Sequence, residues 1–411
     1  MSLLKVNEVQ NYNGSSLTLT ASTVSTSAQL NTGGNVSVTG SINVSDDSTT
    51  RSNLGLGSIA TQDSSNVSVT GGSITGTTIV PTSPFSFRNK IINGNFDVWQ
   101  RGTSQTSSGY GSADRWFLAH SGSSKTASQQ SFTVGQTEVP NNPKYYLSQT
   151  VTSVTGAANY VVYFYRIEGV RTLAGKTATL SFYAKADTNK NIVTEGFQWF
   201  GAGGSPSSFT NFSPVTHNLT ASWQKFTTTI SIPSISGKTL GTNGGDYLQI
   251  LFWFDAGTNW DSRTNSLGQQ SGTFDIAQVQ LEEGTVATPF EHRPIGVELS
   301  LCQRYCQAFK ASEHNDTYRR YGNAIAIATT GYHAIVEFKT SMRSAPTLTK
   351  NSSFQLYNGG FVTSVADPSI GSANRENVLL TGTCTGATAG ASYVLLSNNQ
   401  NTSYLIFSSE L

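Results

Sequence analysis

Apolar and polar residues alternate in two similar segments near the start of the chain. "NVSVTGSI" at residues 35–42 and "SNVSVTGGSITG" at residues 65–76 place Val or Ile between Ser, Thr, Asn and Gly. A period of two is typical of a β-strand with one apolar face. The stripe is too thin for one chain to offset the entropy lost on ordering. Two interpretations follow: a stalk in which identical chains share the stripe, or a disordered Ser/Thr/Gly linker.

Longer strand-like runs begin after residue 85 and are separated by Gly, Asn and Pro turn signals. No segment before residue 295 has the period of a long amphipathic helix, so we expect an antiparallel sandwich of about 200 residues. Phe96, Trp99, Trp116 and Trp223 lie in apolar strand patterns and are predicted to be buried. The runs predicted to form strands are residues 145–154, 159–170, 177–187, 222–233, 246–257 and 272–284.

A different pattern begins with "VELSLCQRYCQAF" at residues 297–309. Cys302, Tyr305, Cys306 and Phe309 follow a helical spacing, which predicts a helix with one apolar face. Strand-like runs return at residues 323–330, 333–340, 392–398 and 403–411. The sequence therefore predicts three regions: an attachment and stalk segment at 1–84, a β-sandwich at 85–295, and a helix plus a small β domain at 296–411.

The low charge of the chain excludes a nucleic-acid binder that works by electrostatics. Charged residues make up 12% of the 411 residues and the net charge is +1, whereas neutralising phosphates requires a basic face. No run approaches the roughly 18 apolar residues of a membrane-spanning helix, and "MSLLKVNEVQ" lacks the apolar core of a signal peptide. We therefore expect a soluble protein that is not exported by the usual route. The three cysteines, Cys302, Cys306 and Cys384, predict reduced thiols rather than a disulfide framework.

Trp260 is the candidate ligand contact because it lies in the polar segment "FDAGTNWDSRTNSLGQQSG", where a large ring has little core to join. A flat apolar ring beside planar polar groups suits a sugar, which stacks its C–H face and hydrogen-bonds its hydroxyls. Packing between subunits is the equal alternative for this ring. The segment "FQWFGAGGSPSSF" offers a second, weaker site around Trp199, Phe200 and Phe209. The polar neighbours of Trp260 are Asn259, Asp261, Arg263 and Asn265.

No catalytic or zinc motif stands out. The five histidines lack metal-ligand spacing, and the chain has no G-x-S-x-G turn and no carboxylate pair in a recognisable glycosidase setting. The sequence therefore predicts a protein that is not an enzyme and needs no cofactor.

The segment "TTRSNLGLGSIATQDSSNVSVTGGSITG" at residues 49–76 closely resembles the shaft motif of bacteriophage tail-fibre proteins. In that family, such segments form thin, intertwined homotrimeric stalks. The resemblance thus favours the stalk over the linker, and it implies attachment to other virion proteins through the N-terminal region.

The middle region resembles a jelly-roll module of phage tail-fibre and minor tail proteins, itself similar to carbohydrate-binding modules. The likeness implies recognition of host surface polysaccharide or lipopolysaccharide. Related modules often hold a structural Ca²⁺, for which Asn95, Asp97 and Asp275 lie in comparable places. Residues 89–103, 113–118, 171–186, 221–233 and 276–294 carry the likeness.

Together these expectations describe a mainly β protein with a thin trimeric stalk, a central jelly roll, a short helix and a C-terminal β domain. The resemblance implies a homotrimeric phage tail fibre, made in the host bacterial cytoplasm and carried on the virion, that binds a glycan without cleaving it. Two alternatives remain: a structural virion protein, such as a head fibre or tail adaptor, and a polysaccharide-cleaving tailspike.

Overall fold

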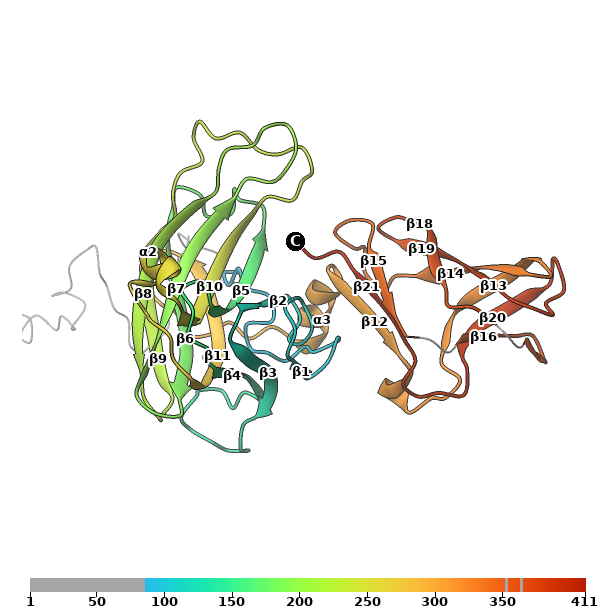
Figure 1. Ribbon diagram of the computed structural model, residues 1–411, viewed down its shortest axis with the longest axis horizontal. Helices are drawn as coiled ribbons and strands as arrows, with labels where there is room; N and C mark the ends of the chain where they lie inside the picture. Colours follow the sequence, from blue (N-terminus) through green and yellow to red (C-terminus); the bar gives the residue numbers. More distant parts are fainter. Residues whose placement is uncertain (1–85, 352–353, 363–364) are drawn as a thin grey trace, which may run out of the picture. The chain divides into compact units, whose positions relative to one another are not determined.

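Strands dominate the part of the chain that the structure describes. The computed structural model describes residues 86–411 apart from 352–353 and 363–364 (Figure 1). The predicted stalk at 1–84 and its two repeats lie outside the described residues.

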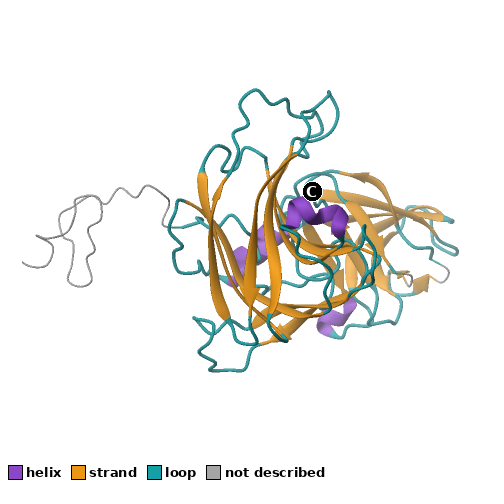
Figure 2. Cartoon of the chain, turned by 60° about the vertical axis from the view of Figure 1, so that its left-hand side comes forward, coloured by secondary structure: helices purple, strands orange, loops and turns teal. Residues whose placement is uncertain are grey.

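Residues 104–283 form two antiparallel sheets that face one another as a jelly roll, which confirms the predicted sandwich (Figure 2). The first sheet has the order β1-β3-β4-β11-β6-β9 and the second the order β2-β5-β10-β7-β8. The first sheet consists of β1 (Ser104–Gln105), β3 (Ser124–Ser131), β4 (Tyr145–Thr152), β11 (Gly272–Glu283), β6 (Thr177–Ala186) and β9 (Gln224–Ser231). The second consists of β2 (Trp116–Ser121), β5 (Tyr160–Glu168), β10 (Tyr247–Ala256), β7 (Lys190–Trp199) and β8 (Thr210–Leu219).

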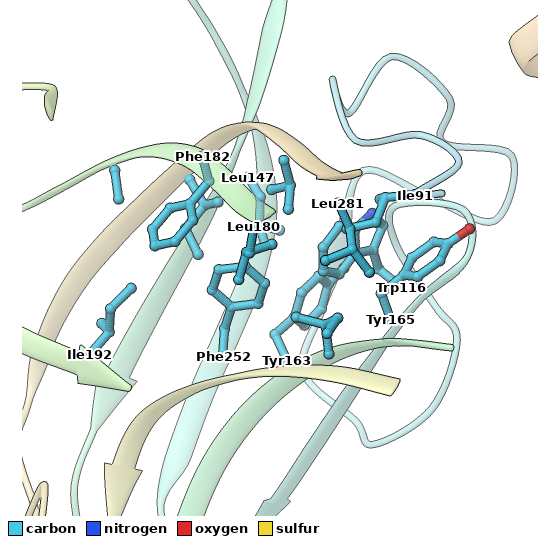
Figure 3. Packing of buried hydrophobic residues seen from close by; sticks show 14 of the residues in the cluster. Ile91, Trp116, Leu147, Tyr163, Tyr165, Leu180, Phe182, Ile192, Phe252 and Leu281 are labelled. Atoms are coloured by element: carbon cyan, nitrogen blue, oxygen red, sulfur yellow. The ribbon is translucent and has the colours of Figure 1, made fainter. Parts of the chain in front are cut away.

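The main core lies between these two sheets (Figure 3). Trp116 is buried at its centre, stacked on Tyr163 at 5.6 Å between ring centroids. Phe96 is also fully buried, so the predictions for Phe96 and Trp116 are confirmed. Trp99 is half-buried against this core.

Trp223 is less buried than the sequence predicts. Trp223 is half-buried and packs on Phe132 and Tyr146, each at 5.2 Å between centroids. It lies just before β9 and is not part of the main core cluster.

Residues 306–408 form two further antiparallel sheets around a separate core. A three-stranded sheet has the order β12-β21-β15, and a seven-stranded sheet has the order β17-β16-β20-β13-β14-β19-β18. The first contains β12 (Cys306–Lys310), β21 (Tyr404–Ser408) and β15 (Thr347–Lys350). The second contains β17 (Phe361–Val362), β16 (Phe354–Tyr357), β20 (Ser392–Ser397), β13 (Arg320–Ala328), β14 (Gly331–Glu337), β19 (Asn377–Thr383) and β18 (Ser369–Ala373).

The predicted helix around Cys302 and Phe309 is only partly formed. Helix α3 (Ile295–Gln303) ends before Tyr305, and Cys306 and Phe309 lie in β12, which pairs with β21. Strand pairing with a distant segment therefore overrides the helical spacing. The remaining short helical elements are η2 (Thr258–Trp260), α2 (Asp261–Thr264) and η3 (Ala311–His314). No helix of the described residues is long and apolar enough to cross a membrane.

Candidate functional site

The five-stranded sheet of the jelly roll is apolar on both faces. In β5, Val161, Tyr163 and Tyr165 point into the main core. Because successive side chains of a strand point to opposite faces of the sheet, the residues between them lie on the other face. That opposite face carries a second apolar cluster. We call its ring-bearing surface the aromatic face, defined by Phe117, Tyr160, Phe197, Trp199, Phe209, Tyr247, Trp253 and Trp260.

Trp260 lies at one end of the aromatic face. Elements η2 and α2 follow β10, and α2 packs beside β7 and β8 (Figure 1). The centroid of the Trp260 ring lies 5.4 Å from that of Trp253 and 4.9 Å from that of Tyr160. The indole N–H donates to the carbonyl of Ala158 at 3.3 Å. The ring is half-buried. The expectation that it has little core to join is therefore corrected, because the second cluster supplies that core.

Arg263 links this end to the middle of the sheet. Its Nε and Nη2 donate to the two carboxylate oxygens of Glu195 at 2.8 and 2.9 Å, and the indole N–H of Trp253 donates to the same carboxylate at 2.9 Å. The guanidinium lies 5.2 Å from the centroid of Trp253 and 5.6 Å from that of Trp260. Burial raises the pKa of Glu195, against the lowering effect of Arg263. The ion pair fixes one guanidinium among several rings.

The other end of the aromatic face carries a second guanidinium. Arg166 lies 4.9 Å from the centroid of Phe164 and 4.6 Å from that of Tyr247. Phe197 stacks on Phe209 at 5.2 Å, and 52% of Phe209 is exposed. Trp199 is half-buried at the end of β7, 6.4 Å from Tyr247. Rings and guanidinium groups therefore alternate along this face.

The structure brings together only part of the predicted set. Trp260 and Arg263 are neighbours, and Trp199 shares their sheet face. Asn259 is exposed and Asp261 begins α2. Two further predicted residues play other parts: Asn265 donates to the carbonyl of Pro214, and Phe200 is fully buried.

Sequence reasoning missed Glu195, Phe197 and Tyr160. One signal was available: "YVVYFYRIE" and "YLQILFWFDA" are apolar runs with almost no alternation. Such runs indicate strands that are covered on both faces. They could have located the second apolar cluster, although not the residues that cover it.

The three calcium candidates contact other polar side chains. The side-chain amide of Asn95 donates to Asp97 at 2.8 Å, while Asp275 lies 3.7 Å from the ammonium of Lys185. Burial raises the pKa of both carboxyls. Among the described residues, no group of three or more His, Cys, Asp or Glu side chains is arranged to hold a metal ion. A Ca²⁺ ion needs six to eight oxygens, so the assignment of Asn95, Asp97 and Asp275 to such a site stays a prediction.

The cysteines match the predicted thiol state. Cys302, Cys306 and Cys384 are all free and buried. Burial raises the pKa of the Cys302 and Cys306 thiols far above the ordinary value, so both are held as neutral packing groups.

Comparisons with known proteins give similarity at the level of single modules. No protein-family model matches the chain, and no curated protein matches it. A solved structure described as "CBM4 structure and function" is 22% identical, with a TM-score of 0.28, over 47% of this chain and 98% of that one. The CBM22-2 xylan-binding domain from Paenibacillus barcinonensis is 16% identical, with a TM-score of 0.26, over 41% and 92% of the two chains.

A phage structure also matches. The enzymatically active domain of tailspike protein 4 from bacteriophage CBA120 is 12% identical, with a TM-score of 0.30, over 48% of this chain and 22% of that one. TM-scores this low carry no argument about function. The jelly-roll assignment rests on the strand order of the two sheets.

Proposed function

We propose that this chain is a homotrimeric phage tail fibre that binds a host cell-surface glycan without cleaving it. The proposal includes attachment to the virion through residues 1–84. It is supported by the resemblance of residues 49–76 to tail-fibre shafts and of the middle region to carbohydrate-binding jelly rolls.

The observation that carries glycan binding is the layer of rings and guanidinium groups on the aromatic face. Trp260, Phe197 and Phe209 offer ring surfaces, and Arg263 lies among them, held by Glu195. Rings suit the apolar face of a sugar, and a fixed guanidinium donates to hydroxyl or acidic groups. Nε and Nη2 of Arg263 donate to Glu195, and Nη1 makes no hydrogen bond within the described residues. That nitrogen is the donor that we assign to the glycan.

Weak sites suffice if three act together. Aromatic contacts contribute about 0.5–1.5 kcal/mol beyond area burial, so one sugar platform binds weakly. Linking three such sites raises the overall affinity by orders of magnitude through effective concentration. Reversible adsorption to a cell surface follows from this arrangement.

The test compares Trp260→Ala and Phe209→Ala with the parent chain in binding of labelled protein to host cells. Three sites multiply the loss at each one, so we expect adsorption to fall about a hundredfold for Trp260→Ala. Trp223→Ala removes a half-buried tryptophan that precedes β9 and lies outside the aromatic face, and it serves as the matched control. Thermal melting separates lost binding from lost folding, because Trp260 also packs on Trp253. Unchanged adsorption in both variants would reject the aromatic face as the glycan site.

The virion assignment has its own test. Labelling of phage particles with an antibody against this chain, viewed by electron microscopy, should place it on tail fibres. Label on the head or at a tail junction would favour the structural virion protein.

A further inference from the structure

Exposed apolar side chains gather on one face of the seven-stranded sheet. Six of the thirteen exposed large hydrophobic residues in the described part of the chain belong to this face or its rim. A concentration of this kind marks a surface that another molecule covers. The six are Tyr318, Ile325, Ile327, Ile335, Tyr357 and Phe361, between 38% and 56% exposed.

The strand register shows that these residues share one face. Val394 of β20 pairs with Asn323 of β13, which pairs in turn with Ile335 of β14. Paired residues in neighbouring strands point to the same side of a sheet. Ile325 lies two residues after Asn323 and therefore points the same way. The four strands β16, β20, β13 and β14 lie side by side in this order (Figure 1).

The face has a recess on one side and a ridge on the other. The recess is lined by the rings of Tyr318, Tyr357 and Phe361 over Val394 and Leu396, with Arg320 at its edge. Phe361 lies 5.6 Å from Tyr318 and 4.9 Å from Tyr357 between centroids. The ridge consists of Ile325, Ile327 and Ile335 on β13 and β14. Strands are about 4.8 Å apart, and β20 of the recess neighbours β13 of the ridge, so the two features lie side by side on this face.

We propose that the isoleucine ridge of one copy of this chain packs into the aromatic recess of the next, so that the seven-stranded sheets form a closed ring. A ridge and a recess on one face can meet reciprocally in a two-fold pair or head to tail in a ring. We take the ring, because the proposed fibre has three copies. The recess carries Arg320 and no acidic residue, whereas Glu337 is exposed two residues after Ile335 on the ridge side of β14, so the two surfaces carry opposite charges. The whole chain has a net charge of +1, so its copies do not repel one another strongly.

The contact explains both features with a single partner. β-branched side chains fit between aromatic rings, and each protomer supplies one ridge and one recess, so none is left uncovered. The contact itself does not rest on glycan binding at the aromatic face; only the number of copies, three, is taken from the proposed fibre.

Cysteine cross-linking in the full chain tests the contact. Thr329 is exposed in the turn beside the ridge, and Asn358 is exposed beside the recess. Thr329→Cys combined with Asn358→Cys, treated with a short bismaleimide linker, should give bands of two and three linked chains on a denaturing gel. The three native cysteines are buried and provide little background. Each single variant is the control, because neither alone carries both partners of the contact.

Charged substitutions on the ridge provide the second measurement. Ile325→Lys with Ile335→Lys in the double-cysteine chain should lower the cross-linked fraction at least tenfold. Val134→Lys is the matched control, because Val134 is fully exposed on the jelly roll, outside this face. Cross-linking no greater than in the single variants would overturn the contact, and bands of two chains only would overturn the ring.

A glycan in the recess gives a different result. Phe361→Ala would then weaken binding to host cells while the double-cysteine chain gave no cross-links, which would also overturn the proposal. Loss of glycan binding in Trp260→Ala with intact cross-linking, or the reverse, separates this contact from the aromatic face.

Discussion

Gly94 lies where even the smallest side chain would collide with β11. A Cβ at this position would be 2.1 Å from the carbonyl oxygen of Val279. The amide of Val279 also donates to the carbonyl of Gly94 at 2.8 Å. The "NG" of the sequence therefore does more than form a turn, because it lets the first part of the jelly roll lie directly on its last strand.

Gly94→Ala should destabilise the protein by about 1–3 kcal/mol, because overpacking forces backbone shifts. Gly296→Ala is the matched control: Gly296 lies in α3 with no atom within 4 Å of its added Cβ. There the change should be neutral or stabilise by up to about 1 kcal/mol through helix propensity. Chemical denaturation of both variants measures the difference. Equal stability of the two would show that the backbone at Gly94 yields without cost.

His217 is a buried, uncharged side chain that makes stability depend on pH. Its Nε2 lies 2.8 Å from the hydroxyl of Thr194, and its ring contacts Phe182 and Phe226. Burial lowers the pKa of His217 to about 4 from the ordinary value of 6.5. As pH falls from 6.5 to 4, His217 becomes protonated in the unfolded chain but stays neutral in the folded chain. His217 therefore removes stability over this range, by up to about 3 kcal/mol.

The comparison of parent and His217→Gln isolates this effect. Burial also raises the pKa of Asp114, to about 6, and a raised carboxyl pKa gives the opposite slope, with stability gained as pH falls. The difference between the two unfolding free energies should be constant above pH 6.5 and shrink towards pH 4. Parallel curves down to pH 4 would contradict the assignment to His217.

At the scale of elements, the sequence predicted strands well where apolar residues are dense. β4, β5, β6, β9, β10 and β11 all fall within predicted runs. β8 was missed because its residues are largely polar and half-exposed. α3 was predicted too long because Cys306 and Phe309 are buried through β12, and their helical spacing is fortuitous. Local patterns report burial reliably, but they do not report which partner buries a residue.

At the candidate site too, local sequence patterns did not reveal which distant residues lie together. Trp260 and Arg263 were selected because a ring and a cation stood out in a polar segment. Glu195 and Phe197 join them only because β7 pairs with β10, with Leu251 opposite Glu195. A pairing between strands 56 residues apart follows from the whole sheet, so no local pattern could have placed Glu195 beneath Arg263.

The chain segment after β21 links the C-terminal sheets to the jelly roll. Glu410 pairs with Arg101 at 3.0 Å and with Arg115, and all three side chains are at most 7% exposed. Arg115 lies between the rings of Tyr165 and Tyr305, at 5.3 and 3.5 Å. Arg343 donates to the carbonyls of Ser409 and Glu410. Glu410 thus pairs with two buried guanidinium groups, and the buried carboxyl of Asp114 also interacts with that of Arg101.

Glu410→Gln should therefore lower the free energy of unfolding by about 3–5 kcal/mol, because removing one partner of the ion pairs leaves buried positive charge uncompensated. Glu283→Gln is the matched control, since its pair with Lys176 is exposed and worth about 1 kcal/mol or less. Calorimetry of both variants measures the contrast. A loss under about 1 kcal/mol for Glu410→Gln would mean that water reaches Arg101 and Arg115.

At the scale of the whole molecule, the proposed fibre requires several copies. In that proposal, the stalk predicted from the alternating segments of residues 35–76 and the ridge-and-recess face are both covered by other copies of the chain. Light scattering of the full chain should give about three times its 43.9 kDa mass. Ile325→Lys with Ile335→Lys should keep this mass if residues 1–84 hold the copies together, while the cross-links described above are lost. A monomer of the parent chain at micromolar concentration would contradict both contacts.

The proposed mode of action leaves the glycan intact. At the aromatic face, the carboxylate of Glu195 is occupied by Arg263 and Trp253, and nearby Asp255 is fully buried and accepts from Ser123, Ser153 and Gln270. Carboxylates held by such donors are poorly placed to transfer a proton to a glycosidic oxygen. Purified protein should therefore release no reducing ends from host capsule or lipopolysaccharide over hours. The burial that raises the pKa of Glu195 makes it the acid to examine first. Steady release that Glu195→Gln abolished would instead identify a cleaving tailspike.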